Sequence, residues 1–346
     1  MGVQISDIIP RKEIELKDLK GKTIAIDAFN TLYQFLTTIR QADGTPLTNT
    51  KGEVTSHLSG LFYRNISLLL EGIKPIYVFD GKPPELKLKE IEERKKLKEL
   101  ARENFEKAKE EGDSESMKKY ASQTVKMTDK IIEQSKALLE AMGIPVIQAE
   151  SEGEAEAALL AECGLVWASA SQDYDSILYA TPRLIRNLTL SKKRRTSSGM
   201  MVDTKIEMIE FEEVLNKLQI NQEKLICLAI LVGTDYNPGG VRGIGQKRAL
   251  EIVQKYEYPV KIFEFVANSD KYSLEFDWQA IFKQFKDLKA KTTKDERIIF
   301  NKVNREKVIE ILVGKNGFAE DRINSGLDKL KSLDELKKQK ELTEFF

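Results

Sequence analysis

Apolar and polar positions alternate in blocks along the first half of the chain, with short apolar runs between longer amphipathic stretches. Three of the apolar runs have the length and the Ile, Val and Ala content of buried strands. They span residues 23–27, 75–80 and 165–173. Between the first two runs, the pattern predicts helices at about 31–40 and 55–71, on either side of a polar turn at 43–46. This order is that of βαβ units and predicts an α/β fold with a mostly parallel central sheet flanked by helices.

A charged stretch interrupts this alternation between two predicted core strands. From Pro84 to Glu111 the chain is mostly Glu, Lys, Arg, Leu and Ala, and the stretch ends at Gly112. Strong helix formers with so few apolar positions predict a helix that has little core to pack on. Such a helix is either a mobile functional element or an ordinary solvated surface helix. Further on, the pattern predicts a helix at about 129–142 and another strand at 144–147.

Each of the three apolar runs ends on an aspartate. These residues are Asp27, Asp80 and Asp173. A single aspartate in this position often only caps the next helix. Three together predict a metal site, because the carboxyl ends of parallel strands meet in one crevice and gathered carboxylates repel one another unless a cation neutralises them. Oxygen ligands suit Mg²⁺ or Mn²⁺, and a chain with His57 as its one histidine and two separate cysteines offers little for zinc.

Two pairs of acidic residues strengthen the expectation of a metal site. Asp173 and Asp175 lie two residues apart, and in an extended chain such side chains project to one side. Glu152 and Glu154 lie at the start of a predicted helix, where residues two apart do not share a face. If both bind one metal, we therefore expect Glu152 to lie before the regular helix or in a distorted first turn. The alternative is that Ser151 caps this helix and forms a capping box with Glu154.

A glycine turn in the second half of the chain opens a helix that carries cations. The turn contains Gly243 and Gly245, and Arg242, Lys247 and Arg248 lie beside it. Free amides at a helix N-terminus, with the close approach that glycine allows, bind phosphate groups. A short Gly-x-Gly is an ordinary turn in many proteins, but the neighbouring cations favour contact with a nucleic-acid backbone.

Composition limits the class of protein without naming a partner. The chain has 346 residues, 41% of them apolar, which is ample for a large core. Its 55 basic and 55 acidic residues leave no net charge, so a nucleic-acid partner requires segregated basic patches. Two cysteines without regular spacing fit a reducing compartment. No run of about 18 apolar residues and no signal-peptide core is present, and we expect no membrane partner although residues 1–6 match the loose myristoylation pattern.

Several short motifs, in a fixed order, carry a family resemblance. They are Val78–Pro84, Glu150–Ala157, Gln172–Asp175, Gly233–Tyr236 with Arg242–Gly245, and the terminal Gln339–Phe346. Over almost the whole chain, this set resembles the flap endonuclease family of structure-specific 5′ nucleases, in its archaeal form. The resemblance implies a PIN-like 5′ nuclease core with a helical arch and a helix-two-turn-helix element for DNA binding. It places a nuclease domain at 1–330, with the arch at 82–135 and the helix-two-turn-helix at about 225–260, and a clamp-binding tail at 331–346.

The resemblance also implies a catalytic machinery based on two Mg²⁺ ions, for which Mn²⁺ can substitute. The family's metal carboxylates correspond to Asp27, Asp80, Glu152, Glu154, Asp173, Asp175 and Asp235. The family's catalytic cations on the arch correspond to Lys87 and Arg94, which lie seven residues apart and so share a helix face. Without the resemblance, both would be taken as solvated residues among the many on that helix.

Further residues correspond to the family's DNA and partner contacts. The DNA-binding set is Tyr33, which stacks on a base near the cleavage site, with Arg40, Arg64, Gly243, Gly245, Lys247 and Arg248 along the path and Phe318, Glu320 and Arg322 at a one-nucleotide 3′ flap. Carbonyls of Gly240, Val241 and Ile244 correspond to ligands of a possible K⁺ ion, although one extra residue at 237–240 departs from the eukaryotic pattern. The residues that correspond to the sliding-clamp motif are Gln339, Leu342, Phe345 and Phe346.

The implied activity is 5′-flap endonuclease and 5′–3′ exonuclease cleavage of branched or nicked DNA, in Okazaki fragment maturation and base excision repair. We expect a monomeric enzyme that binds a sliding clamp of the PCNA type, in the cytoplasm of an archaeon or in the nucleus if the source is eukaryotic. The alternatives are another 5′ exonuclease or excision-repair nuclease of the same superfamily, and a noncatalytic clamp-bound replication scaffold. A haloacid-dehalogenase-like phosphatase is excluded because it needs a second aspartate two residues after Asp27, where Phe29 stands.

Overall fold

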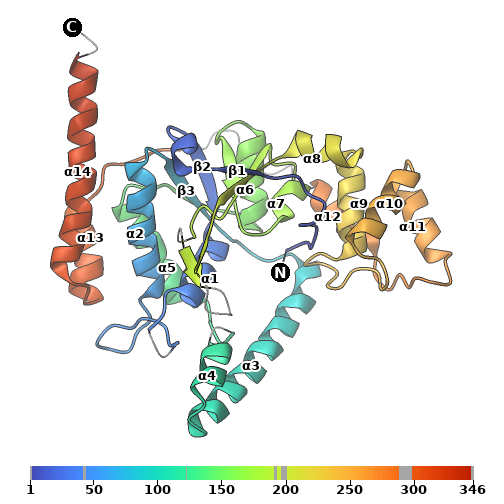
Figure 1. Ribbon diagram of the computed structural model, residues 1–346, viewed down its shortest axis with the longest axis horizontal. Coiled ribbons are helices and arrows are strands. Elements are labelled where there is room, and N and C mark those ends of the chain that lie inside the picture. The colour runs from blue at the N-terminus through green and yellow to red at the C-terminus, as the bar shows by residue number, and fades with distance from the viewer. Residues whose placement is uncertain are drawn as a thin grey trace.

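A seven-stranded sheet forms the centre of the molecule in the computed structural model, which describes residues 2–41, 44–121, 123–190, 193–195, 201–287 and 298–343 (Figure 1). The strands are β1 (Lys12–Ile14), β2 (Thr23–Asp27), β3 (Lys74–Phe79), β4 (Val146–Gln148), β5 (Ala168–Ala170), β6 (Arg183–Arg186) and β9 (Ile206–Glu210). Their order is β1-β9-β6-β5-β2-β3-β4, and the strands from β6 to β4 are parallel. Strands β9 and β1 add an antiparallel edge. The predicted mostly parallel sheet is therefore confirmed.

The chain changes its direction of travel across the sheet beside β2. It moves outward from β2 to β3 and β4, and then crosses back to β5 on the other side of β2. Ligands of such sheets bind beyond the carboxyl ends of the strands at this switch point. Asp27 ends β2 and Asp80 directly follows β3, but β5 already ends at Ala170. The predicted strand at 165–173 was too long, and Asp173 lies in the loop that follows.

Alternate residues of the central strands pack against helices on opposite faces of the sheet. The helices concerned are α1 (Ala28–Thr38), α2 (Ser56–Leu70), α5 (Asp129–Ala141) and α6 (Gly153–Glu162). Ile24 and Ile26 join a buried cluster with residues of α1, α2 and α5, whereas Ala25 packs with Leu160 of α6. Helices α2 and α5 match their predicted ranges to within one residue, and α1 starts three residues earlier than predicted because Asp27 caps it.

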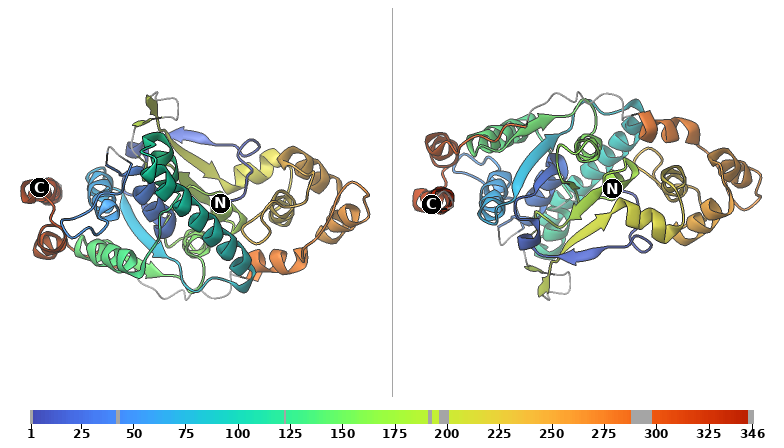
Figure 2. Two further views of the ribbon diagram at one scale, coloured as in Figure 1. Left: turned by 90° about the horizontal axis from the view of Figure 1, so that it is seen from below. Right: turned by 90° about the horizontal axis from the view of Figure 1, so that it is seen from above.

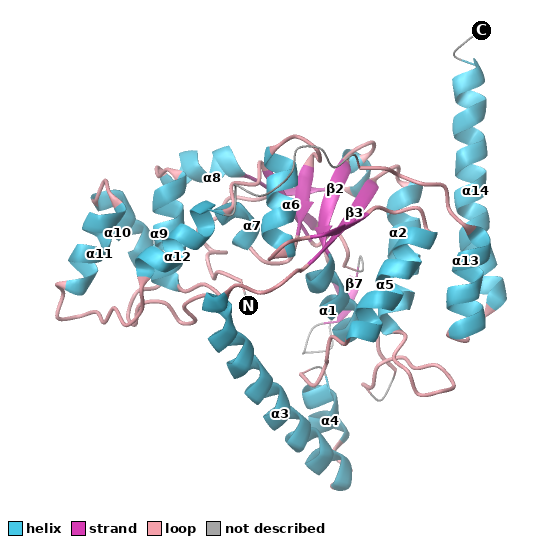
Figure 3. Ribbon diagram, turned by 180° about the vertical axis from the view of Figure 1, so that it is seen from behind, coloured by secondary structure: helices cyan, strands magenta, loops and turns pink. Residues whose placement is uncertain are grey.

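The charged stretch forms an arch that projects from the body (Figure 3). It consists of a 3₁₀ turn at Glu85–Lys87, α3 (Leu88–Glu110) and α4 (Ser114–Ala121). The buried residues of α3 are Glu90, Ala101 and Ala108, so the helix packs little apolar surface, as its composition predicts. A buried glutamate on such a helix was not predicted.

Two further groups of helices lie at opposite ends of the molecule (Figure 2). One end holds α8 (Phe211–Leu218), α9 (Gln222–Val232), α10 (Gln246–Lys255), α11 (Pro259–Ala267) and α12 (Trp278–Asp287). The other end holds α13 (Arg305–Ile309), a π-helical segment at Glu310–Lys315 and α14 (Glu320–Thr343), which runs across the expected domain boundary at 330. The remaining elements in the described ranges are a 3₁₀ turn at Leu16–Leu19, α7 (Asp175–Leu178) and a separate hairpin of β7 (Lys193–Arg195) and β8 (Met201–Asp203). None of the helices in the described ranges is long and apolar enough to cross a membrane.

Candidate active site

Two strand-end aspartates lie at the centre of the site. Asp27 is both the last residue of β2 and the N-cap of α1, where its carboxylate accepts a hydrogen bond from the Asn30 amide at 3.0 Å. Asp80 accepts a hydrogen bond from the Gly153 amide at 2.7 Å. A Cβ on Gly153 would lie 2.8 Å from the Asp80 carboxylate, so glycine is needed for this close approach. The helix-capping and metal-binding interpretations of Asp27 are therefore compatible with each other.

The two glutamates take different places at the start of α6. Glu152 is the N-cap, with extended backbone at φ −90° and ψ 127°, so it does lie before the regular helix as the metal hypothesis requires. Because Glu152 holds the cap position, the alternative capping box of Ser151 with Glu154 is wrong. Glu154 instead accepts a hydrogen bond from the Ser176 hydroxyl of α7 at 3.1 Å.

Asp173 and Asp175 are brought together by the start of the chain. Tyr174 has helical dihedrals of φ −90° and ψ −3° and α7 begins at Asp175, so the expectation of extended chain was wrong. Asp173 accepts hydrogen bonds from the Gly2 amide at 3.2 Å and from the Asn30 side chain at 3.1 Å. Asp175 accepts one from the Val3 amide at 2.8 Å. Val3 is buried, so this segment is packed against the site. The structure therefore gives no support to the myristoylation pattern at residues 1–6.

We expect Gly2→Ala to lower the cleavage rate, because a Cβ on Gly2 would lie 2.5 Å from the Asp173 Cβ and would displace that carboxylate. A displacement of about 1 Å can lower an enzymatic rate on the order of 100-fold. Single-turnover cleavage measures the effect. Gly314→Ala is the matched control, since an added Cβ there meets nothing within 4 Å. Equal rates for the two variants would contradict a role for the Gly2 amide.

Burial and mutual repulsion make this carboxylate cluster unfavourable in its charged form. Burial and the neighbouring Asp80 raise the pKa of Asp27 to about 8. Burial and Asp235 raise the pKa of Asp175 to about 7. Burial also raises the pKa of Asp80, and burial together with Asp175 raises the pKa of Glu154 well above its ordinary value. A cation would relieve both effects, so the buried, oxygen-only donors fit a hard divalent ion.

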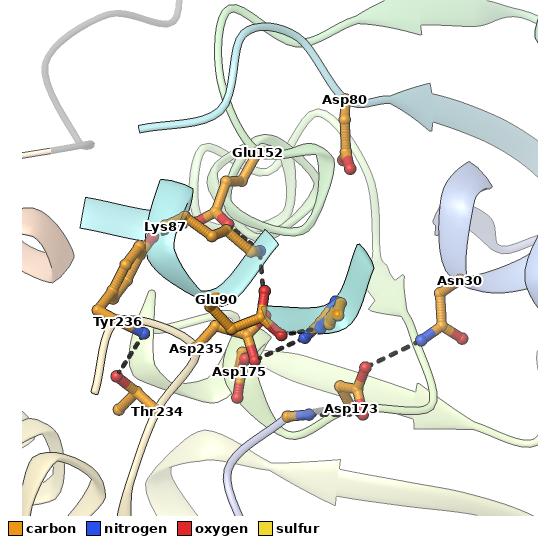
Figure 4. Close-up of polar contacts among 12 residues, drawn as sticks. Asn30, Asp80, Lys87, Glu90, Glu152, Asp173, Asp175, Thr234, Asp235 and Tyr236 are labelled. Atoms are coloured by element: carbon orange, nitrogen blue, oxygen red, sulfur yellow. Dashed lines mark hydrogen bonds and ion pairs between the residues drawn. The ribbon is translucent and has the colours of Figure 1, made fainter. Parts of the chain in front are cut away.

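Among the described residues, the carboxylate side chains of the site do not form a coordination shell. Within the described part of the chain, no group of three or more His, Cys, Asp or Glu residues is placed to hold an ion as it stands. Two cations of the arch lie among the carboxylates instead (Figure 4). Lys87 Nζ forms ion pairs with Glu152 and, at 3.1 Å, with Asp235. Arg94 Nη2 lies 3.1 Å from Asp235, and its Nε is paired with Glu90.

These ion pairs explain the two opposite pKa shifts at the arch contact. Burial alone would lower the pKa of Lys87, but the charges of Glu152 and Asp235 raise it above its ordinary value. Burial would raise the pKa of Asp235, and Lys87 and Arg94 lower it instead. The Lys87 ammonium and the Asp235 carboxylate are therefore both held in their charged forms.

Two tyrosines that were not predicted from the sequence hold Glu152. The hydroxyls of Tyr179 and Tyr236 both donate to Glu152 Oε2, that of Tyr179 at 3.0 Å, and they lie 3.1 Å from each other. Phe285 of α12 packs on both rings. Tyr236 belongs to the Gly233–Tyr236 motif, which was the one available signal. Spacing could not have indicated Tyr179, since the three partners come from distant segments.

The predicted DNA contacts of the arginines and of Tyr33 involve side chains that already have partners in the protein. The Tyr33 hydroxyl accepts a hydrogen bond from Lys98 of α3 at 2.9 Å, and the ammonium lies 4.8 Å from the ring centroid. Arg40 donates to the carbonyls of Thr37 and Gly44, and Arg64 to that of Leu190. Contact of these three residues with DNA remains a prediction.

The glycine turn has the backbone that the sequence predicts. Gly243 has a left-handed φ of 86° and Gly245 is the N-cap of α10, with Lys247 and Arg248 exposed in its first turn. Arg248 pairs with Glu251 at 2.6 Å. Of the carbonyls expected to hold K⁺, that of Val241 accepts a hydrogen bond from the Ile244 amide at 3.0 Å.

The predicted 3′-flap residues and the described part of the clamp-binding segment lie at the far end of the molecule from α10. Phe318, Glu320 and Arg322 lie where the π-helical segment leads into α14 (Figure 2). Phe318 is partly buried against the core, and Glu320 and Arg322 are exposed. Gln339 and Leu342 lie in the last turns of α14, and Phe345 and Phe346 lie outside the described residues.

Comparisons with known proteins agree with this arrangement. Residues 1–101 match the XPG N-terminal domain and residues 143–235 match the XPG I-region. Flap endonuclease 1 of Pyrococcus furiosus is 50% identical over 347 aligned residues, covering 100% of this chain and 99% of that protein.

Solved structures show the same relationship in space. The structure of flap endonuclease-1 from Methanococcus jannaschii has a TM-score of 0.75 and 43% identity, and the match covers 97% of this chain and 100% of that one. The catalytic core of Rad2 in complex with DNA substrate shares the fold, with a TM-score of 0.68 at 22% identity, over 95% of this chain and 100% of that one. The chain belongs to the flap endonuclease family.

Proposed function

We propose that this protein is a structure-specific flap endonuclease that cuts 5′-flap DNA with two Mg²⁺ ions and also degrades DNA as a 5′–3′ exonuclease. Nucleases of its family depend on divalent metal ions. The observation that carries the proposal is the buried carboxylate cluster at the switch point of the sheet, with Lys87 and Arg94 of the arch directed into it.

The carboxylates would hold the ions, and the arch would complete the site. The metal-holding set is Asp27, Asp80, Glu152, Glu154, Asp173, Asp175 and Asp235. When bound, the ions supply Lewis acidity, an activated water and stabilisation of the leaving oxygen. The Lys87 ammonium and the Arg94 guanidinium are placed to bind the scissile phosphate once the metals neutralise the carboxylates that they now contact.

Sites farther away would select the DNA structure. The amides of the glycine turn and the exposed Lys247 and Arg248 at the start of α10 present donors for a duplex backbone, which a K⁺ ion at the turn would help to hold. Tyr33 presents an aromatic face for a base at the junction. The segment from Phe318 to Arg322, at the other end of the molecule, would receive a 3′ flap.

Cleavage of a 5′-flap substrate labelled at its 5′ end tests the proposal. With Mg²⁺ or Mn²⁺ we expect a single main incision at the junction, and no product with Asp173→Ala although that variant still binds the DNA. Release of the label as a mononucleotide from the free end of a 5′-labelled duplex, with no incision at the junction, would favour the exonuclease alternative. Binding without any metal-dependent cleavage would favour the noncatalytic scaffold.

We also propose that the last residues bind a sliding clamp of the PCNA type. Gln339, Leu342, Phe345 and Phe346 have the spacing at which an apolar side chain and two aromatic rings can enter one pocket. Deletion of residues 342–346 should abolish clamp binding and clamp stimulation while sparing intrinsic flap cleavage and thermal stability. Calorimetry with the purified clamp measures the loss of binding. Thermal melting and cleavage without the clamp measure the properties that should be unchanged. A truncated protein that unfolds earlier, or binds the clamp unchanged, would contradict it.

A further inference from the structure

Glu90 is an eighth acidic side chain at the site, in addition to the seven proposed to hold metal. It lies on α3 and is 7% exposed, whereas the other buried residues of that helix are alanines. Figure 4 shows it on the side of the arch helix that faces the carboxylates, where it shares Arg94 with Asp235. Lys87, Glu90 and Arg94 are spaced three and four residues apart, so they share one face of the helix.

Glu90 and Asp235 hold opposite parts of the same guanidinium. Glu90 Oε1 is paired with Arg94 Nε, and Asp235 Oδ1 accepts from Arg94 Nη2 at 3.1 Å. The other oxygen of Glu90, Oε2, is buried and has no hydrogen-bond partner among the described residues. An arginine side chain has many rotamers of similar energy. Two carboxylates that anchor different nitrogens of its guanidinium select one of these rotamers.

The stability of the helix does not account for this arrangement. An exposed i,i+4 ion pair on a helix contributes little to stability, and leaving a buried oxygen without a hydrogen bond costs more than such a pair contributes. Burying Glu90 with Oε2 unsatisfied therefore opposes folding. A buried oxygen of this kind therefore calls for an explanation other than the stability of the helix.

Metal binding would affect the two partners of Arg94, Glu90 and Asp235, in different ways. Asp235 belongs to the body and is a proposed metal ligand, so a bound cation would compete for its charge. Glu90 belongs to the same helix as Arg94, so this pair depends neither on the position of the arch relative to the body nor on the charge of Asp235. Glu90 is thus the anchor that still orients Arg94 in the loaded enzyme.

We propose that Glu90 is a positioning residue that fixes the rotamer of Arg94 and points its Nη groups at the scissile phosphate. The inference rests on the proposed role of Arg94 in flap cleavage. Glu90 itself touches neither phosphate nor metal. Its effect on the rate should therefore be exerted entirely through Arg94.

Single-turnover cleavage and DNA binding of five variants test this inference. The variants are Glu90→Ala, Glu90→Gln, Arg94→Ala, the Glu90→Ala/Arg94→Ala double variant and Glu93→Ala, an exposed control on the same helix. We expect Glu90→Ala to lose on the order of 10-fold in rate, as for other residues that orient a catalytic group, with little change in DNA affinity. Glu90→Gln should recover part of this rate, because its carbonyl can still accept from Arg94 Nε. Glu93→Ala should match the unmodified protein.

The double variant separates positioning from a general effect on the arch. We expect it to be no slower than Arg94→Ala, because Glu90 has nothing to position once the guanidinium is gone. Independent, multiplying losses would overturn the inference and indicate a structural role. A faster Glu90→Ala enzyme would overturn it too, since Glu90 would then compete with phosphate for Arg94. An Arg94→Ala variant of normal rate would instead refute the proposed role of Arg94, on which the inference rests.

Discussion

Asp27→Asn should abolish flap cleavage and, at the same time, make the metal-free protein more stable. The amide removes a charge that burial and Asp80 make unfavourable, while asparagine still accepts the capping hydrogen bond from Asn30. We expect the free energy of unfolding to rise by about 0.5–2 kcal/mol at high pH, the usual range for substitutions that relieve a strained active site. Cleavage should fall below detection, because an amide is a poor ligand for a hard cation.

The gain in stability should depend on pH in a defined direction. The pKa of Asp27 is about 8 in the folded protein against an ordinary value of 3.8, so the folded state holds the proton more tightly than the unfolded chain. The stability of the unmodified protein is therefore greatest below the lower value and is lost as the pH rises towards the higher one. The gain from Asp27→Asn should be absent near pH 4 and complete above about pH 8.

Chemical denaturation in chelator across this pH range measures the gain. Asp129→Asn is the control, since Asp129 is exposed in the first turn of α5 and lies outside the cluster. Adding Mg²⁺ should stabilise the unmodified protein more than Asp27→Asn and reduce the difference between them. A variant that is destabilised at pH 8 in chelator would show that Asp27 is not under electrostatic strain.

The sequence predicts the carboxylate cluster well because its members obey a rule of sheet topology. Asp27 and Asp80 follow apolar runs, and parallel strands place such residues at one edge of the sheet. The same rule says nothing about the chain between strands. The extended backbone predicted for Asp173 and Asp175 was therefore wrong, because Tyr174 has helical dihedrals and α7 begins at Asp175. The positions of these residues were predictable, but their local conformation was not.

Other parts of the site depend on contacts between distant segments. The amides of Gly2 and Val3 reach Asp173 and Asp175 across some 170 residues of sequence. Backbone donors leave no signature in side-chain patterns, so no reading of the sequence would have found them. The burial of Glu90 was hidden for a different reason, since one glutamate among many on a charged helix gives no periodic signal.

The positions of Lys87 and Arg94 suggest how the cluster is held in the absence of metal. Four carboxylates of the site have raised pKa values, whereas that of Asp235, which both cations contact, is lowered. The arch thus neutralises one side of the cluster, and a phosphate would have to replace these carboxylates as the partner of both cations. Metal binding would favour this exchange, because it would neutralise the negative charge that attracts the arch.

Lys87→Ala should lower the single-turnover rate of flap cleavage on the order of 100- to 1,000-fold, the range for loss of one donor to a developing negative charge. DNA affinity should change little, since most of it comes from backbone contacts elsewhere. Binding of Mn²⁺ without DNA should become tighter, because the ammonium that pairs with Glu152 and Asp235 is gone. Lys89→Ala, at an exposed position on the same helix, is the matched control. A loss that high Mg²⁺ restores fully, or one that appears only in DNA affinity, would mean that Lys87 guides metal or substrate and does not act on the phosphate in the transition state.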